Sequence, residues 1–117
     1  MDRKAFNEFC AGLKATHHVV QWGNSDVWKV GTKFFALCGW HKEGDAFTFK
    51  VTPLAYEVLS DMPGLRPAPY LASRGMKWIQ HYEAPGLSDT ELKAHIVTSY
   101  EMVAANLTKK QRTELGL

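Results

Sequence analysis

The N-terminal segment has the hydrophobic period of an α-helix. Its apolar residues fall at positions i, i+3, i+4 and i+7, which places them on one helix face: Phe6, Phe9, Cys10 and Leu13. Asp2 precedes this run, and its side chain is of a type that caps helix N-termini. Gly12 weakens the other end because glycine has a low helix propensity. We therefore expect a helix that begins after Asp2 and ends near Gly12.

From residue 18 to residue 51 the apolar residues form short runs typical of β-strands. The predicted strands cover residues 18–22, 27–30, 33–38 and 46–51. Gly31 and Thr32 form a two-residue connection that suits a type II′ hairpin, because glycine readily takes the positive φ at its first position. The last run alternates between an apolar face and a polar face that carries Thr48 and Lys50. This alternation predicts a half-exposed antiparallel strand.

The next segments are a short helix, a loop and a further strand. Thr52 is a suitable N-cap, and Pro53 is tolerated at the first helical position because the N–H group there has no helical partner. We expect this helix to end near Ser60. Residues 65–75 contain two prolines and a glycine and are predicted to form an irregular loop. A strand is expected from residue 76 to residue 82.

Two capping boxes mark helices at the C-terminal end. Ser88 is followed three residues later by Glu91, and Thr108 by Gln111, so each pair has the spacing that caps a helix start. The predicted order is therefore one helix, four strands, a helix, a strand and two helices. Consecutive strands with short turns indicate an antiparallel sheet, and the helices must cover one face of it to bury their apolar sides.

Length and composition agree with one soluble domain over residues 1–117. Hydrophobic residues make up 45% of the 117 residues and charged residues 22%, as in ordinary globular proteins. Cys10 and Cys38 form no C-x-x-C pair and lie in apolar runs, which predicts two buried free thiols in a reducing compartment. We find neither the pattern of a signal peptide nor an apolar run that would span a membrane, so a cytoplasmic location is expected.

Four segments of the chain resemble the MmcQ/YjbR family, in order and over nearly its whole length. The segments are Val30-Gly31-Thr32-Lys33-Phe34-Phe35-Ala36, Phe49-Lys50-Val51 before the Thr-Pro helix start, Arg66-Pro67-Ala68-Pro69-Tyr70-Leu71 with Trp78, and Ser99-Tyr100 with Val103 and Leu107. The resemblance implies an α+β fold similar to frataxin (CyaY-like), with helices on one face of an antiparallel sheet. Family members are commonly labelled DNA-binding because of structural similarity to a double-wing arrangement, so the resemblance implies DNA as a partner.

The frataxin likeness does not extend to iron. Frataxins carry many carboxylates on the first helix, whereas residues 2–14 hold only Asp2 and Glu8. Hard cations require oxygen-rich sites. The five histidines show no metal-ligand spacing, and adjacent His17 and His18 would point to opposite faces of a strand. We expect neither a metal nor another cofactor.

The net charge of +2 is too small to indicate nucleic-acid binding, so the distribution of basic residues matters. The candidate contacts to nucleic acid or another anion come from strands, turns and the 65–75 loop: Lys29, Lys33, Lys50, Tyr70, Arg74, Lys77 and Trp78. If the strand lysines alternate away from the apolar face, they form a positive strip beside Trp28 and Trp78. The alternative is that these lysines lie on a solvated sheet face and only prevent the sheet from pairing with strands of other molecules.

Three functions remain open from the sequence. The first is a DNA-binding protein that contacts phosphates through the basic sheet face and the hairpin tips. The second is a small-molecule or anion-binding protein with a pocket between the 65–75 loop and the sheet. The third is a protein–protein adaptor with an aromatic surface. No catalytic motif is present, and Ser99 is expected to be a small packing residue or bonded to its own helix, so the chain is expected not to be an enzyme. A monomer or weak homodimer is expected.

Overall fold

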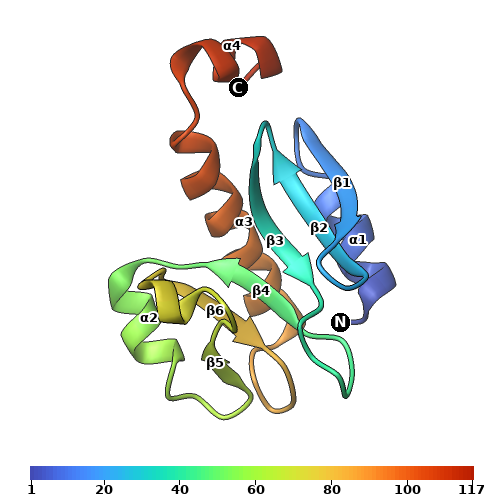
Figure 1. The fold of residues 1–117 in the computed structure, drawn as a ribbon, viewed down its shortest axis with the longest axis vertical. Coiled ribbons are helices and arrows are strands. Elements are labelled where there is room, and N and C mark those ends of the chain that lie inside the picture. Colours follow the sequence, from blue (N-terminus) through green and yellow to red (C-terminus); the bar gives the residue numbers. More distant parts are fainter.

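A single six-stranded antiparallel sheet organises the protein (Figure 1). The computed structural model describes residues 1–117. The strands are β1 (Thr16–Gln21), β2 (Ser25–Val30), β3 (Lys33–Cys38), β4 (Phe47–Lys50), β5 (Leu65–Pro67) and β6 (Trp78–His81). Their order across the sheet is β1-β2-β3-β4-β6-β5. The first four strands thus form a meander, and β6 returns beside β4 with β5 at the edge.

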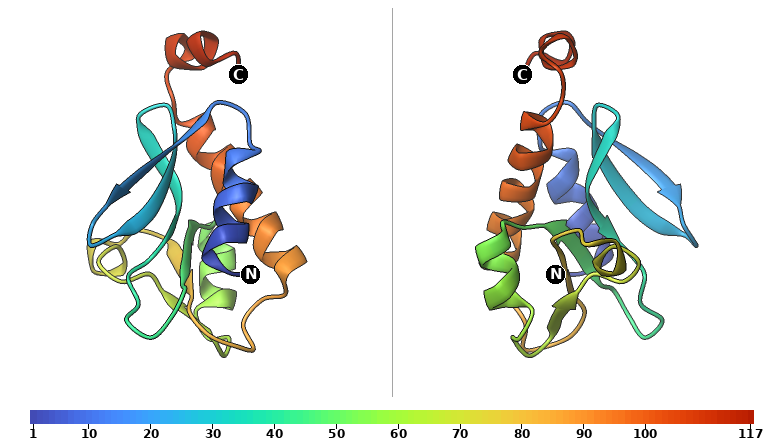
Figure 2. Two further views of the ribbon diagram at one scale, coloured as in Figure 1. Left: turned by 90° about the vertical axis from the view of Figure 1, so that its right-hand side faces the viewer. Right: turned by 60° about the vertical axis from the view of Figure 1, so that its left-hand side comes forward.

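The helices lie on one face of this sheet, as the sequence predicted. They are α1 (Arg3–Ala11), α2 (Pro53–Leu59), α3 (Asp89–Ala105) and α4 (Lys109–Leu115). A short 3-10 helix, η1 (Ala72–Arg74), lies with its segment on the opposite face. Figure 2 shows α1 and α3 side by side against the sheet, while α4 lies beyond the β2–β3 hairpin. No helix of the protein is both long enough and apolar enough to cross a bilayer.

The predicted helix starts are confirmed by their hydrogen bonds. The Asp2 side chain accepts from the Ala5 N–H at 2.8 Å, and Thr52 caps α2. Both capping boxes are complete: Ser88 and Glu91 bond reciprocally at the start of α3, and Thr108 and Gln111 do so at the start of α4. Local sequence therefore sets these boundaries, because each cap satisfies backbone N–H groups that have no partner inside the helix.

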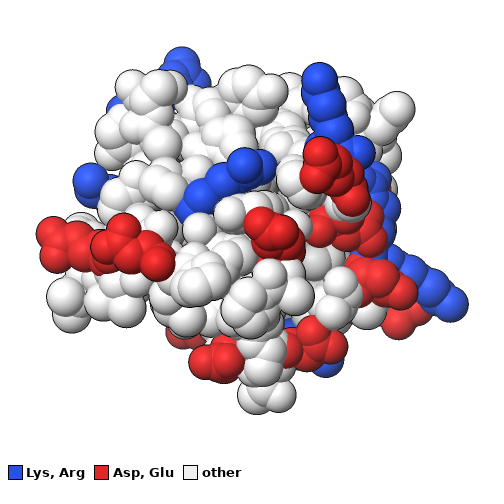
Figure 3. Space-filling view, turned by 90° about the horizontal axis from the view of Figure 1, so that it is seen from below, with Lys and Arg blue, Asp and Glu red and all other residues white.

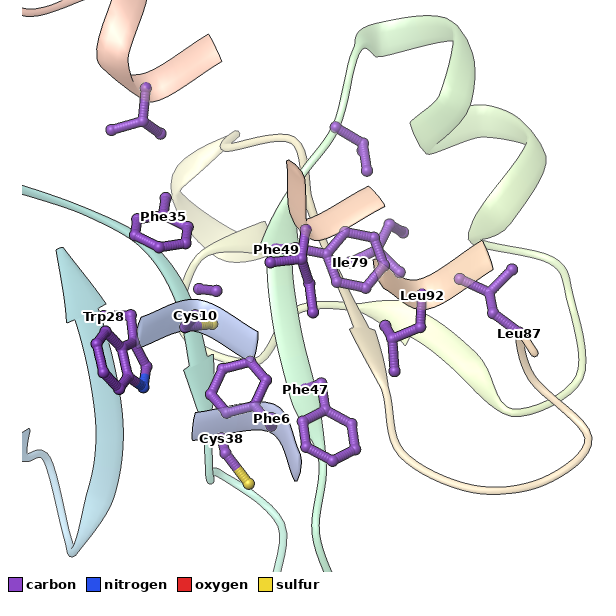
Figure 4. Close-up of a cluster of buried hydrophobic side chains, with 14 of the residues drawn as sticks. Phe6, Cys10, Trp28, Phe35, Cys38, Phe47, Phe49, Ile79, Leu87 and Leu92 are labelled. Atoms are coloured by element: carbon purple, nitrogen blue, oxygen red, sulfur yellow. The ribbon is translucent and has the colours of Figure 1, made fainter. Parts of the chain in front are cut away.

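The hydrophobic core lies between the helices and one face of the sheet, which we call the helix face (Figure 4). Aromatic side chains dominate it: the rings of Phe6 and Phe47 are 5.2 Å apart, and Phe35 meets Tyr100 edge to face at 5.3 Å. Cys10 and Cys38 are buried free thiols here, as predicted. Trp28 also belongs to this core, and its indole N–H donates to Asn7 Oδ1 at 2.9 Å. It is therefore not part of an exposed basic strip.

A bulge in β3 changes which residues reach each face. Trp28 pairs with Ala36 and Lys29 pairs with Phe34, so Phe35 is an extra residue in β3. As a result Phe35 and Ala36 both join the helix-face core, and Phe34 packs on the opposite side of the sheet. Regular alternation from Ala36 would have placed Phe34 in the helix-face core and Phe35 on the opposite side, so the bulge exchanges the faces of the two phenylalanines.

Ser99 of α3 binds the sheet at this bulge. Its hydroxyl donates to the Phe35 carbonyl at 2.6 Å and accepts from the Lys50 N–H at 2.8 Å. The pairing of β3 with β4 ends at Ala36 and Phe49, so these two backbone groups would otherwise lack partners. The expectation that Ser99 is only a packing residue or bonds its own helix is wrong, because the helix delivers it to the gap between two diverging strands.

Three further local predictions are corrected by the structure. Residues 65–75 are not wholly irregular: β5 pairs with β6, and η1 follows. A three-residue edge strand has too little alternation to be read from sequence. Thr48 is fully buried and not on an exposed face, because the opposite side of the sheet is also covered. β1 spans Thr16–Gln21, which leaves Trp22 in the following turn.

Candidate functional site

The second face of the sheet, which we call the aromatic face, carries no α-helix. Val27, Leu37, Thr48 and Gln80 pair across neighbouring strands on this face, and each is fully buried. The turn at Trp40 lies over this face, since Gln80 Nε2 donates to the Trp40 carbonyl at 3.2 Å. Segment 68–74 covers the neighbouring area, where Ala68 and Leu71 pack on Trp78. Turns and loops thus form the second layer of the protein.

Aromatic rings form a continuous chain of contacts on this face. Phe34 stacks on Trp78 with ring centroids 4.7 Å apart and meets Trp22 edge to face at 5.3 Å. Trp22 in turn contacts Trp40 at 5.7 Å, and Trp40 contacts Tyr70 at 5.2 Å. Trp78 is buried and Phe34 is half-buried, whereas Trp22 is 46% exposed and Tyr70 is 70% exposed. Large apolar rings therefore reach solvent on a concave surface, which is unusual for residues without a ligand or partner.

Two hollows that share aromatic walls lie next to each other on this surface, and a third, more polar hollow adjoins them at Trp40. The aromatic hollow has a volume of about 480 Å³ and is lined by Trp22, Phe34, Trp40, Tyr70, Leu71 and Arg74. The basic hollow has a volume of about 320 Å³ and is lined by Trp22, Lys29, Thr32, Lys33, Phe34, Lys50, Met76, Trp78, Val103 and Asn106. They share Trp22 and Phe34 as a common wall. Together they make one groove with aromatic rings at one end and three lysines at the other.

The structure brings six of the seven predicted site residues to this groove. Lys29, Lys33, Lys50 and Trp78 line the basic hollow, and Tyr70 and Arg74 line the aromatic hollow. Lys77 lies elsewhere, with its Nζ 4.6 Å above the ring of Tyr56 on α2. It precedes Trp78 in an extended segment, so the two side chains point to opposite faces. Lys77 therefore does not join the other six residues at the groove.

The β2–β3 hairpin tip is packed against the C-terminal helices. Gly31 has φ +60°, and an added Cβ would meet both Leu107 methyl groups at 3.2 Å. Thr32 keeps a negative φ, which agrees with the predicted type II′ turn. Lys33 Nζ donates to the Asn106 carbonyl at 3.3 Å, so one lysine of the basic hollow also binds the end of α3. The hairpin end is thus fixed in place and is not a free wing.

Three aromatic residues of the aromatic hollow have an uncommon backbone conformation. Trp22 has φ +53°, Trp40 has φ +61° and Tyr70 has φ +68°, and only Ala15 and Asn24 share positive φ among the other non-glycine residues. A bulky side chain in the left-handed region is strained by about 1–2 kcal/mol. Such strain persists where the surrounding structure enforces it, and it concentrates at functional sites.

Phe34, Trp22 and Trp40 were missing from the predicted site. Phe34 could not be found by alternation, because the β3 bulge reverses its face. Trp22 and Trp40 carried a usable signal: each stands beside a glycine in a turn, where no core requires a tryptophan. Aromatic residues in turns are better candidates for exposed binding surfaces than aromatic residues in regular strands.

Charge is distributed unevenly between the two ends of the molecule. Figure 3 views the end that carries β5 and the β3–β4 connection, where several Asp and Glu side chains are exposed together with some Lys and Arg side chains. The loops there contain Glu43, Asp45, Asp61 and Glu83. The opposite end carries the basic hollow and α4, with Lys109, Lys110 and Arg112. Acidic loop residues thus gather at one end and basic residues near the other, although Lys42 and Arg66 lie beside Glu43 and Glu83, and α4 also carries Glu114.

The thiols and the buried serine are used in packing or hydrogen bonds. Burial raises the pKa of Cys38 to about 11, and burial likewise raises the pKa of Cys10. Both thiols therefore stay protonated near neutral pH and are weak nucleophiles. Ser99 Oγ is occupied by two hydrogen bonds inside the structure. None of these groups lines the groove.

Sequence comparison assigns the chain to a family. The family model described as YjbR matches residues 11–102, which include every residue of the aromatic hollow and most of the basic hollow. The chain belongs to the YjbR family. This confirms the resemblance drawn from the hairpin, the 66–71 segment and the Ser99 helix. No functionally curated protein matches the sequence.

Two solved structures show the same fold. The Deinococcus radiodurans protein DR2400, with a DUF419 domain, superposes with a TM-score of 0.84 at 22% identity, covering 99% of this chain and 88% of that one. A Pseudomonas syringae protein superposes with a TM-score of 0.70 at 21% identity, covering 88% of this chain and 99% of its own. The likeness of these YjbR-type structures supports the six-stranded α+β architecture.

Proposed function

We propose that this YjbR-family protein binds a nucleic-acid strand in the groove of its aromatic face. The observation that carries the proposal is the convergence of Lys29, Lys33 and Lys50 on a hollow that shares Trp22 and Phe34 with an aromatic hollow. Proteins that bind strands without sequence readout combine a positively charged track for phosphates with rings on which bases stack. The groove has both parts, side by side, on a rigid sheet.

The groove favours a single strand over a duplex. Bases in a duplex are stacked on each other and do not offer their faces to Trp22 or Tyr70. The lysines can neutralise phosphates of either form, so the aromatic rings are the part that discriminates. The packing of the β2–β3 hairpin tip against Leu107 also removes it as an independent wing for a duplex groove. Phosphate contacts therefore come from the face of the sheet.

The proposed role is binding without catalysis. A nucleophile would have to be activated by a base and oriented by a third group. The side chains that line the two hollows are aromatic, aliphatic, basic and neutral polar, and no carboxylate or histidine is among them. The groove thus offers contacts for a strand and no acid–base pair to act on it.

Fluorescence anisotropy with labelled single-stranded and duplex DNA at rising salt tests the proposal. The informative variant replaces Lys29, Lys33 and Lys50 with Gln. Its matched control replaces three exposed lysines outside the groove, Lys4, Lys77 and Lys93, with Gln. Each lost phosphate contact lowers the log–log salt slope by about 0.7 on a single strand, so the groove variant should lose a slope of about 2.

The control should keep the slope of the wild-type protein, since both triple variants carry the same net charge. Equal losses in the two variants would mean that binding follows overall charge and not the groove. Failure of the wild-type protein to bind either DNA at low salt would remove the proposal.

A second candidate is a small planar anion as the natural ligand. The aromatic hollow supports it, because the 70–74 segment closes over the sheet and places Arg74 beside the rings. A volume of about 480 Å³ is within the usual range for small-molecule sites, roughly 300–1,000 Å³. A ligand of this kind would bind without dependence on Lys29 and Lys50, so the triple lysine variant separates the two candidates.

A further inference from the structure

The three strained aromatic residues of the aromatic hollow share a second property. The carbonyl group of each one accepts a hydrogen bond from a polar side chain. Ser25 Oγ donates to Trp22 at 3.0 Å, Gln80 Nε2 donates to Trp40 at 3.2 Å, and Ser73 Oγ donates to Tyr70 at 3.4 Å. The left-handed conformation of each ring-bearing residue is thus stabilised by a specific partner.

Two of these partners, Ser25 and Gln80, are buried polar residues. Gln80 is fully buried on the aromatic face, and Ser25 is 1% exposed. Gln80 also accepts from Arg66 Nε at 2.7 Å, which fixes the orientation of its amide. Burying polar groups is unfavourable unless they are well bonded, so a fold that needed only stability would use apolar residues here.

Gly39 shows how closely the two supported turns approach each other. A Cβ at Gly39 would lie 2.2 Å from Ser25 Oγ, so only glycine fits between the turn that carries Trp22 and the turn that carries Trp40. The close approach brings the two indole rings to 5.7 Å with 37° between their planes. Tyr70 stands nearly perpendicular to Trp40, at 78°. The rings form walls at different angles and not a flat stacking platform.

We propose that Trp22, Trp40 and Tyr70 form a cage that takes one nucleobase of the bound strand out of its stack. This inference rests on the proposed function and names the part of the strand that the aromatic hollow binds. Arg74 lines the same hollow and supplies a positive charge for the phosphate of that nucleotide. The same charge disfavours a cationic occupant, which aromatic cages otherwise bind well. Ser25 and Gln80 are positioning residues, since they act on the ligand only through the rings.

The test compares a labelled thymidylate strand with the same sugar-phosphate strand lacking bases. The wild-type protein should bind the strand with bases about tenfold more tightly, because each stacked base contributes on the order of 1–3 kcal/mol. Tyr70→Ala and Trp22→Ala should reduce this preference to less than about twofold and leave the salt slope unchanged. Tyr70→Phe is the matched control and should retain the preference, because it keeps the ring.

The positioning role has its own readout. Ser25→Ala should lower the preference for bases severalfold without changing the salt slope, because the phosphate contacts do not involve Trp22. If Ser25→Ala lost both the salt slope and the preference for bases, the substitution would have disrupted the groove as a whole, which would contradict the positioning role of Ser25. Near-UV circular dichroism checks that each variant keeps its packed aromatic rings. If Ser25→Ala unfolds, the Tyr70→Ala variant still tests the cage, because Tyr70 is largely exposed and its loss should not unfold the protein.

The outcomes separate the cage from the strand proposal. Equal binding of both strands to the wild-type protein overturns the cage and leaves strand binding through phosphates intact. Binding of neither strand overturns the proposed function, and the cage is then judged with free adenosine by the indole N–H signals of Trp22 and Trp40. Shifts that disappear in Tyr70→Ala support the cage. No shift with millimolar adenosine, or shifts with tetramethylammonium instead, overturns it.

Discussion

Both faces of the sheet carry aromatic residues, but the two sets differ in burial and in backbone conformation. On the helix face Phe6, Phe47 and Phe49 are covered by α1 and α3 and have ordinary strand or helix backbones. On the aromatic face Trp22 and Tyr70 come from turns, have positive φ and remain partly exposed. The first arrangement maximises burial. The second holds apolar rings in strained, accessible positions, which contributes less to the stability of the fold and is what the proposed binding function requires.

The largest effect should come from opening the helix face. Phe49→Ala removes a fully buried ring between α3 and the sheet, and such replacements typically lower the free energy of unfolding by about 3–5 kcal/mol. Tyr70→Ala, on a ring that is 70% exposed, should change it by less than about 0.5 kcal/mol. Urea unfolding of both variants gives the comparison. Equal losses would contradict the division of roles between the two faces.

Removing the link between α3 and the β3 bulge should have the next largest effect. Ser99→Ala leaves the buried Phe35 carbonyl and the Lys50 N–H without their partner, which costs about 1–3 kcal/mol. Amide hydrogen exchange should show faster exchange at Lys50 in particular. A variant with unchanged stability and unchanged exchange at Lys50 would show that the hydroxyl does not hold the diverging strands together.

Acid should lower the free energy of unfolding through two histidines of the helix face. Burial and then the N-terminal ammonium lower the pKa of His81, and both of its ring nitrogens are buried without a partner; burial also lowers the pKa of His95. The unfolded chain therefore binds more protons below pH of about 6.5, so stability is complete above that pH and decreases as the pH falls further.

Denaturant midpoints measured between neutral and mildly acidic pH test this expectation. A histidine whose pKa is one unit lower in the folded than in the unfolded state changes the free energy of unfolding by about 1.4 kcal/mol when the pH falls below both pKa values. The variant with both His81→Leu and His95→Leu should show a flatter pH profile than the wild-type protein. A profile as steep as that of the wild-type protein would assign the acid sensitivity to other groups.

The smallest effect, and the one of opposite sign, is expected on the aromatic face. Tyr70→Gly relieves the strain of a positive φ and removes a largely exposed ring, so it should raise the free energy of unfolding by up to about 1 kcal/mol. The same variant should lose affinity for a single strand. Thermal unfolding and anisotropy on one preparation measure both. A gain in affinity with a loss of stability would reverse the interpretation of this face.

Much of the helix face could be predicted from the sequence. The apolar spacing in residues 6–13, the N-cap of Thr52 and the capping boxes at Ser88 and Thr108 each depend on neighbours within four residues. Such local interactions leave a direct pattern in the sequence. The candidate lysines and Tyr70 could also be named, because basic and aromatic residues in strands and loops are recognisable by type. That they line one groove could not be read from the sequence, because it depends on how the strands and loops are arranged in space.

The tertiary structure alone decided the composition of the aromatic face. The extra residue Phe35 in β3 moves Phe34 to the groove, and nothing within the strand indicates which position bulges. The side chains of Ser25 and Gln80 support Trp22 and Trp40 through contacts across separate elements. The pairing of β6 with β4 places Trp78 on the aromatic face, so the preceding residue, Lys77, points to the opposite side and lies over Tyr56 of α2. The sequence by itself determined the α-helices, most of the strands and the charge available. Long-range strand pairing decided which side chains meet, because register depends on residues far apart in the chain.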